Sequence, residues 1–255
     1  APDAAVYYTL DGSEPTRRSP RYTEPFVLER AATVRARAFT EKGHDPEGAA
    51  AQFLPPPEPI VEDFEEVPVG AVTPGATTQE DPEKTEYTAR VSDEQAAGGA
   101  HSLKFTDGPG QQHAFSPHVY YRCRFVEGRL VGRFDVRMGR DAQLRYQWRR
   151  YEGSRYRIGP SVLIEPDGKV SSQGKTLLTI PVEQWVRLEV SCVLGAEGKP
   201  AFDLSVWLPG APEPQVFPAL PHAADFERLD WVGLVANGQR EAAFYVDNVE
   251  IRPVE

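Results

Sequence analysis

The chain has 255 residues, with 28 Lys and Arg against 38 Asp and Glu, a formal net charge of −10 and a hydrophobic fraction of 40%. No apolar run approaches the ~20 residues that a spanning helix needs, so we expect no membrane span. Since nucleic-acid-binding domains are usually basic, the acidic balance also argues against a nucleic-acid partner.

Alternation of apolar and polar residues with a period of two dominates the chain, which favours an all-β fold. Pro and Gly are abundant, at 24 and 21 residues, and they mark turns between short strands. Only Ala223 to Leu229 is compatible with a short helical turn. The predicted strands are 5–10, 25–29, 32–39, 101–106, 118–126, 130–138, 143–151, 161–165, 176–180, 185–194, 201–208, 231–235 and 242–251.

A proline-rich stretch, FLPPPEPIVE at 53–62, divides the chain. Consecutive prolines fix the backbone in an extended form and lack the N–H groups that a sheet requires. We therefore predict a semi-rigid linker between a small module at 1–52 and a larger one at 63–255.

Residues 5–43 contain a recognisable pattern: YYTLDGSEPT at 7–16, then Ser19-Pro20 and Tyr22, then TVRA at 33–36. This segment resembles the C-terminal immunoglobulin-like module of chitobiase and β-hexosaminidase enzymes. The resemblance implies an accessory β-sandwich without catalytic residues. The opening strand is missing, so we expect a partial sandwich truncated at its start. Asp11-Gly12 predicts a hairpin turn.

The larger module has three short motifs: DFE at 63–65, GGAHSLKF at 98–105 and FYVDNVEI at 244–251. They resemble the concanavalin-like jelly rolls and carbohydrate-binding modules of bacterial polysaccharide-active enzymes. The resemblance implies an antiparallel jelly-roll β-sandwich over 63–255.

Positive charge is concentrated between residues 96 and 160, which hold 12 basic and 5 acidic side chains. Eleven of these bases are Arg, whose planar guanidinium binds carboxylate and sulfate groups through paired hydrogen bonds. In the strands at 118–124, 131–138 and 143–151, one face is apolar and the other is rich in Arg, Tyr, Gln and His. If the three strands are neighbours, their polar faces form one concave surface.

We predict that this surface binds a polysaccharide, with uronic or sulfated sugars as candidates, because tyrosine rings can pack on sugar C–H groups beside the arginines. The open alternative is an ordinary solvated sheet face. The four tryptophans, Trp148, Trp185, Trp207 and Trp231, are expected in the core. The predicted sugar-binding residues are Tyr120, Arg122, Arg133, Arg137, Arg145, Gln147, Arg149 and Tyr151.

A structural calcium ion is the second candidate ligand. Jelly-roll modules often hold a cation where the first and last strands meet, bound by oxygen atoms. Asp63, Glu65 and Asp247 occupy the matching places in this sequence. The alternative is that these acids face solvent or pair with bases. Cys123 and Cys192 fall on apolar strand faces and are expected as buried free thiols, with a disulfide as the open alternative.

Three functions remain open from the sequence. The favoured one is a non-catalytic carbohydrate-binding fragment of a secreted, cell-surface or periplasmic bacterial protein, with a catalytic domain upstream in the same chain. A polysaccharide lyase or glycoside hydrolase on the same face is the second, since His118 and the tyrosines there could move protons. The third is a structural or protein-interaction β-sandwich without a glycan ligand.

Overall fold

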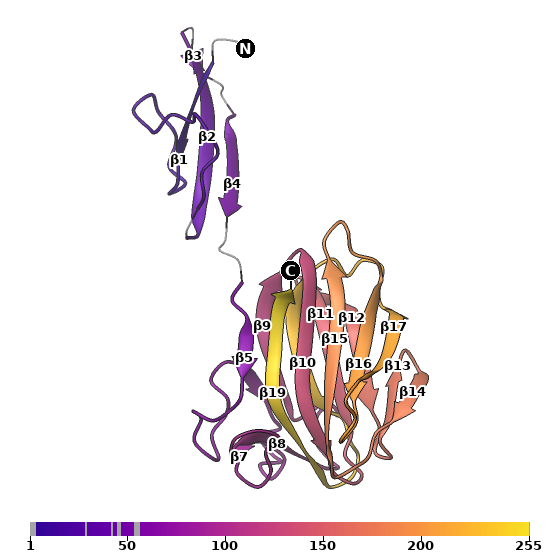
Figure 1. Ribbon diagram of the computed structural model, residues 1–255. Coiled ribbons are helices and arrows are strands. Elements are labelled where there is room, and N and C mark those ends of the chain that lie inside the picture. Colours follow the sequence, from indigo (N-terminus) through magenta and orange to yellow (C-terminus); the bar gives the residue numbers. More distant parts are fainter. Residues whose placement is uncertain (1–3, 29, 42, 45–46, 54–56, 255) are drawn as a thin grey trace. The chain divides into compact units, whose positions relative to one another are not determined.

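The computed structural model describes residues 4–28, 30–41, 43–44, 47–53 and 57–254 (Figure 1). These residues form strands joined by turns and loops, with no helix among them, so the predicted all-β class is confirmed. In particular, none of them forms a helix that could cross a membrane. The chain divides into two compact units, Ala1–Pro57 and Glu58–Glu255, and the division falls inside the predicted linker.

The first unit contains one antiparallel sheet in which the second strand pairs with the other three. The described part of the predicted strand 25–29 is not a strand; its Phe26 packs on the ring of Tyr8 with centroids 4.9 Å apart. Asp11-Gly12 does not close a hairpin; the Asp11 carboxylate instead accepts a hydrogen bond from Ser13 N. The strands are β1 (Ala5–Thr9), β2 (Ala32–Thr40), β3 (Gly43–His44) and β4 (Ala49–Phe53).

The second unit is a sandwich of two antiparallel sheets, as expected for a jelly roll (Figure 1). The eight-stranded sheet has the order β17-β16-β15-β10-β19-β8-β7, with β5 also paired to β19. The seven-stranded sheet has the order β14-β13-β12-β11-β18-β9-β6. The second unit begins at Glu58, so the last five residues of the predicted linker belong to it, and the last three of them form strand β5.

The eight-stranded sheet contains β5 (Ile60–Glu62), β7 (Ala89–Ser92), β8 (Ser102–Asp107), β10 (Gly128–Met138), β15 (Trp185–Leu194), β16 (Ala201–Trp207), β17 (Gln215–Pro221) and β19 (Ala242–Val254). The seven-stranded sheet contains β6 (Thr77–Gln79), β9 (His118–Phe125), β11 (Leu144–Glu152), β12 (Arg155–Ile164), β13 (Lys169–Ser172), β14 (Lys175–Thr179) and β18 (Leu229–Ala236).

The core lies between the two sheets, and each strand contributes alternate residues to it. Trp148 of β11 is fully buried there and donates a hydrogen bond from Nε1 to Tyr146 Oη at 2.8 Å. Gly132 of β10 provides the room for this pair. A Cβ at Gly132 would lie 2.4 Å from Tyr146 Oη and 2.5 Å from Trp148 Cζ2.

Both cysteines are free thiols. Burial raises the pKa of the Cys192 thiol to about 12, and its Sγ lies 3.6 Å from Nε2 of the buried His222. A thiol with so high a pKa is protonated at neutral pH, so this pair is a packed S–H···N contact rather than a nucleophile.

Glu65 fastens the loop before β8. Its carboxylate accepts hydrogen bonds from the backbone N–H groups of Ala100 and His101, each at 2.9 Å. These bonds lower the pKa of Glu65 from its usual value of 4.5, with the bond from His101 as the largest cause.

We predict that Gly132→Ala destabilises the second unit by about 1–3 kcal/mol, because the added methyl group overpacks the Tyr146–Trp148 pair. All four tryptophans lie in this unit, so urea unfolding followed by tryptophan fluorescence measures its stability alone. The matched control is Gly98→Ala, where the new Cβ would meet only Asn248 at 3.7 Å. Equal stability of both variants would contradict this account of the core.

We predict that Glu65→Gln lowers the melting temperature at pH 7, since the amide is a weaker acceptor for two backbone N–H groups. A lowered pKa in the folded state gives stability that is present above the unfolded value of 4.5 and is lost as the pH falls below it. The difference in melting temperature between Glu65→Gln and the wild type should therefore shrink as the pH falls below 4.5. Glu66→Gln, at an exposed neighbouring position, is the control and should show no such convergence.

Candidate functional site

A groove of about 580 Å³ lies on the face of the seven-stranded sheet that points away from the core. We call it the arginine groove. Its lining residues are Gln79, Phe115, His118, Tyr120, Arg122, Arg145, Gln147, Arg149, Tyr151, Tyr156, Ile158, Trp231, Val235 and Asn237.

The strand register explains why these residues meet. β18 lies between β9 and β11, and all three strands present alternate side chains on the groove face. Residues directly opposite each other then form rows across the sheet. The rows are Arg122–Trp231–Arg149, Tyr120–Gly233–Gln147 and His118–Val235–Arg145.

Trp231 forms the floor of the groove. Its ring lies over Gly233, where a Cβ would come within 1.9 Å of the indole, so only glycine leaves space for this position. The Arg149 guanidinium lies 4.0 Å from the centroid of the Trp231 ring and 4.4 Å from that of Tyr156. Tyr120 stacks on the indole with centroids 5.5 Å apart. These contacts hold Arg149 in place without neutralising it.

Hydrogen bonds orient the centre of the groove. Arg149 Nε donates to Gln147 Oε1 at 2.7 Å, and Gln147 Nε2 donates to Ser161 Oγ at 3.2 Å. Gln147 is buried, so both ends of its amide are committed within the sheet. The remaining N–H groups of Arg149 make no hydrogen bond with the residues that the structure describes, so they are available to a ligand.

The charge of the groove is one-sided. Arg122, Arg145 and Arg149 line it, and none of the described residues in its lining is acidic. None of the three arginines makes an ion pair with the described acids. Such a set of unpaired guanidinium groups favours an anionic ligand.

His118 is the one histidine in the groove lining. Its Nδ1 donates to Phe115 O at 2.9 Å, which leaves Nε2 unprotonated in the neutral ring. Burial lowers the pKa of His118 from its usual 6.5, and the nearby Arg149 lowers it further. The imidazole is therefore neutral at pH 7 and able to accept a proton. Tyr120 stacks beside it, with ring centroids 5.6 Å apart.

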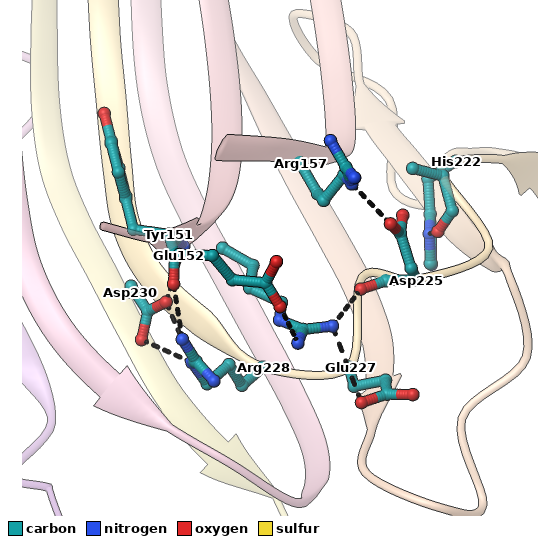
Figure 2. A network of polar contacts seen from close by, with 10 residues as sticks. Tyr151, Glu152, Arg157, His222, Asp225, Glu227, Arg228 and Asp230 are labelled. Atoms are coloured by element: carbon teal, nitrogen blue, oxygen red, sulfur yellow. Dashed lines mark hydrogen bonds and ion pairs between the residues drawn. The ribbon is translucent and has the colours of Figure 1, made fainter. Parts of the chain in front are cut away.

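A polar network at one end of the sheet fixes Tyr151 (Figure 2). Tyr151 N donates to Asp230 Oδ2 at 2.7 Å, and Arg228 bonds both Asp230 and the carbonyl of Tyr151. Figure 2 shows the Tyr151 ring extending away from these contacts. Arg150 joins the same region by donating to Asp225 O. The network therefore holds the backbone of Tyr151 and leaves its ring for the groove.

Six of the eight predicted sugar-binding residues line the groove: Tyr120, Arg122, Arg145, Gln147, Arg149 and Tyr151. The expectation that 118–124, 131–138 and 143–151 share one surface was wrong, because β10 belongs to the other sheet. Arg133 and Arg137 lie on the outer face of that sheet. Arg133 binds Glu189 at 2.6 Å and approaches Glu250 at 3.6 Å, whereas Arg137 lies in register with Trp185 and Tyr245.

The prediction of four core tryptophans needs correction as well. Trp148 belongs to the core, but Trp231 is buried on the groove side, and Trp185 and Trp207 lie half-buried on the outer face of the eight-stranded sheet. The spacing Trp231-x-Gly233 could have indicated that Trp231 lies on the groove face, since a glycine two residues along the same face leaves space for a large ring. Gln79, Phe115, Tyr156 and Asn237 were missed, and they come from segments outside the three strands considered.

The three acids expected to hold calcium are engaged elsewhere. Asp63 accepts from Glu65 N, Glu65 binds the loop before β8, and Asp247 Oδ2 accepts from Ala97 N at 2.8 Å. Asp247 is fully buried, which raises its pKa. Within the described ranges, no three His, Cys, Asp or Glu side chains form a group that could hold a metal ion. Each of these acids thus accepts hydrogen bonds from backbone N–H groups, and the calcium site stays a prediction.

Comparison with known proteins supports the sequence interpretation of the first unit. Residues 1–49 match the family described as the chitobiase/beta-hexosaminidase C-terminal domain, which confirms the resemblance seen in the sequence. No curated protein matches the chain.

Solved structures resemble the chain mainly in fold. The endo-beta-1,4-glucuronan lyase from the fungus Trichoderma reesei is 12% identical, covers 73% of this chain and 94% of its own, and has a TM-score of 0.51. The marine PL-14 alginate lyase from Aplysia kurodai is 12% identical, with coverages of 65% and 87% and a TM-score of 0.48. Carbohydrate-binding modules of the beta-sandwich superfamily are 14% identical, with coverages of 98% and 84% and a TM-score of 0.38.

Identities this low establish fold alone. The chain thus joins a segment that matches the chitobiase/beta-hexosaminidase C-terminal family to a jelly-roll β-sandwich similar in fold to the glucuronan lyase.

Proposed function

We propose that the second unit binds an anionic polysaccharide in the arginine groove. The observation that carries this proposal is the set of three arginines without acidic partners in a groove lined by aromatic rings. Arginine binds carboxylate or sulfate through two parallel hydrogen bonds, and tyrosine faces pack on the C–H groups of pyranose rings. The volume of about 580 Å³ falls within the range of small-ligand sites.

The proposed role is that of an accessory module outside the cytoplasm, in a secreted, cell-surface or periplasmic bacterial protein. A weak binder tethered to a catalytic domain keeps the substrate close and raises its effective concentration. The match of residues 1–49 to an accessory family of chitobiases is in keeping with this role.

We predict that Arg122→Gln, Arg145→Gln and Arg149→Gln each weaken binding of a uronic or sulfated polysaccharide by about tenfold to a hundredfold, since each removes charge-assisted hydrogen bonds. Raising the salt from about 50 to about 500 mM should weaken wild-type binding strongly, because salt screens exposed charges. Affinity electrophoresis or calorimetry measures both effects.

The matched control is Arg133→Gln. It removes one guanidinium from the same sequence segment but on the other sheet, where Arg133 is paired with Glu189. Its affinity should equal that of the wild type. If Arg133→Gln weakens binding as much as the groove variants, or if no anionic polysaccharide binds at all, the proposal is wrong. Capture of a protein partner with no glycan hit would favour a structural or interaction domain instead.

A second candidate function is β-elimination, and the neutral His118 beside Tyr120 favours it. In this reaction a base removes the proton at C5 of a uronate, the C4–O bond breaks, and the departing oxygen takes a proton from an acid. One of the two products carries the new C4=C5 double bond. Neutral His118 could accept the proton, Tyr120 could donate one, and an arginine could stabilise the charge that develops on the carboxylate.

If the groove is catalytic, incubation with polyuronates produces ultraviolet absorbance from the unsaturated product. The rate should then rise with pH through a midpoint below 6.5, since only the neutral form of His118 accepts a proton and its pKa is lowered. His118→Gln should reduce that rate by about a hundredfold or more. His44→Gln, at a histidine of the first unit, is the control. Absence of absorbance with every polyuronate leaves binding as the function.

A further inference from the structure

The arginine groove continues into a second pocket of different chemistry. This pocket, of about 440 Å³, shares Arg145, Gln147 and Ile158 with the groove and extends over β12 and β13. We call it the hydroxyl pocket, after the residues that dominate its far side. They are Ser161, Ser171, Ser172, Gln173 and Thr176.

Together the two sites are long enough for several sugar residues. The strands β9, β18, β11, β12 and β13 are consecutive neighbours in the sheet. At a strand spacing of about 4.8 Å, the surface from β9 to β13 spans roughly 19 Å. An extended chain crossing the strands would therefore contact both sites at once.

The arginine groove and the hydroxyl pocket differ in charge. Beyond the shared Arg145, no described residue that lines the hydroxyl pocket is basic, and Glu165 adds a carboxylate there. Lys175 lies opposite Ser172 in the β13–β14 hairpin but does not line the pocket. An anionic sugar placed in this half would face a like charge with no arginine of its own.

Hydroxyl groups supply the polar surface of the hydroxyl pocket. Ser161 Oγ accepts a hydrogen bond from Gln147 Nε2 at 3.2 Å, and its own O–H can donate. Ser171 of β13 and Thr176 of β14 lie opposite each other, and both line the pocket. Sugar hydroxyl or acetamido groups are neutral partners of the right kind, since they both donate and accept.

We infer, building on the proposed function, that the preferred ligand is a chain in which charged and neutral sugars alternate, and not a continuous polyuronate. The charged sugar lies in the arginine groove between β9 and β11. The neutral neighbour lies in the hydroxyl pocket, beside Ser171 and Glu165. The chain Arg149–Gln147–Ser161 marks the boundary between the two.

The test compares three oligosaccharides of equal length by calorimetry: an unsulfated one that alternates glucuronate with N-acetylglucosamine, a homopolymer of glucuronate, and a neutral one. A fourth, alternating and sulfated, separates carboxylate from sulfate recognition. We expect the alternating chains to bind about tenfold more tightly than the homopolymer, the size expected for one added like-charge contact near the surface. The neutral oligosaccharide should bind weakest.

Three variants test where the effect arises. Glu165→Gln should narrow the difference in affinity between the two chains by improving binding of the homopolymer, whereas Asp167→Asn, which removes a charge outside the pocket, should leave that difference unchanged. Ser171→Ala should weaken binding of the alternating chain more than that of the homopolymer.

Equal affinity for the homopolymer and the alternating chain, with no effect of Glu165→Gln, would overturn the inference while leaving the proposed function intact. Failure of every anionic oligosaccharide to bind would instead overturn the proposed function itself. The two failures are therefore distinguishable in one set of titrations.

Discussion

The alternation of β11 is the constraint on which the rest of the second unit depends. Tyr146 and Trp148 point into the core and are joined by a hydrogen bond, while Gln147 and Arg149 face the groove. A shift of register by one residue would exchange the two sets, burying guanidinium groups and exposing the indole. The large energetic cost of that exchange fixes the register, and the register in turn fixes the groove. The packing of the core and the side chains of the arginine groove are thus set by the same strand.

The arginines of the basic segment fall into two classes according to their surroundings. Acids neutralise the first class: Arg133 on the eight-stranded sheet binds Glu189, and Arg150 at the end of β11 pairs with Glu152. In the groove, aromatic rings take the place of acids beside Arg149. Exposed ion pairs add little stability, so the first class mainly cancels charge, whereas the second preserves charge in a fixed position. Preserved charge is what a binding site for anions needs.

The sequence was informative about each strand and uninformative about which strands are neighbours. Period-two alternation correctly separated the groove side from the core side in β9 and β11, because burial of one face is a local property. It could not show that β10 crosses to the other sheet, since consecutive strands in a jelly roll need not pair. For that reason Arg133 and Arg137 were assigned to the groove. Trp231 was misassigned because burial alone does not tell a core residue from the floor of a groove.

The acids at 63, 65 and 247 illustrate the same limit in another form. Their positions at the first and last strands were predicted well enough to place them near the start and end of the sandwich. What the sequence could not show is that backbone N–H groups of the 97–101 loop would donate to Glu65 and Asp247, and Glu65 N to Asp63. Only coordinates reveal those donors. A carboxylate oxygen that accepts one N–H bond keeps a further lone pair, so the calcium site stays a prediction.

The acidic balance of the whole chain does not conflict with an anionic ligand. At physiological ionic strength, charges are screened beyond about 8 Å, so a bound carboxylate responds to the arginines beside it and hardly to distant acids. The negative charge on the rest of the protein still acts on an approaching polyanion, because it repels the polyanion from surfaces other than the groove. An acidic protein with one arginine-lined groove is thereby more selective than a uniformly basic one.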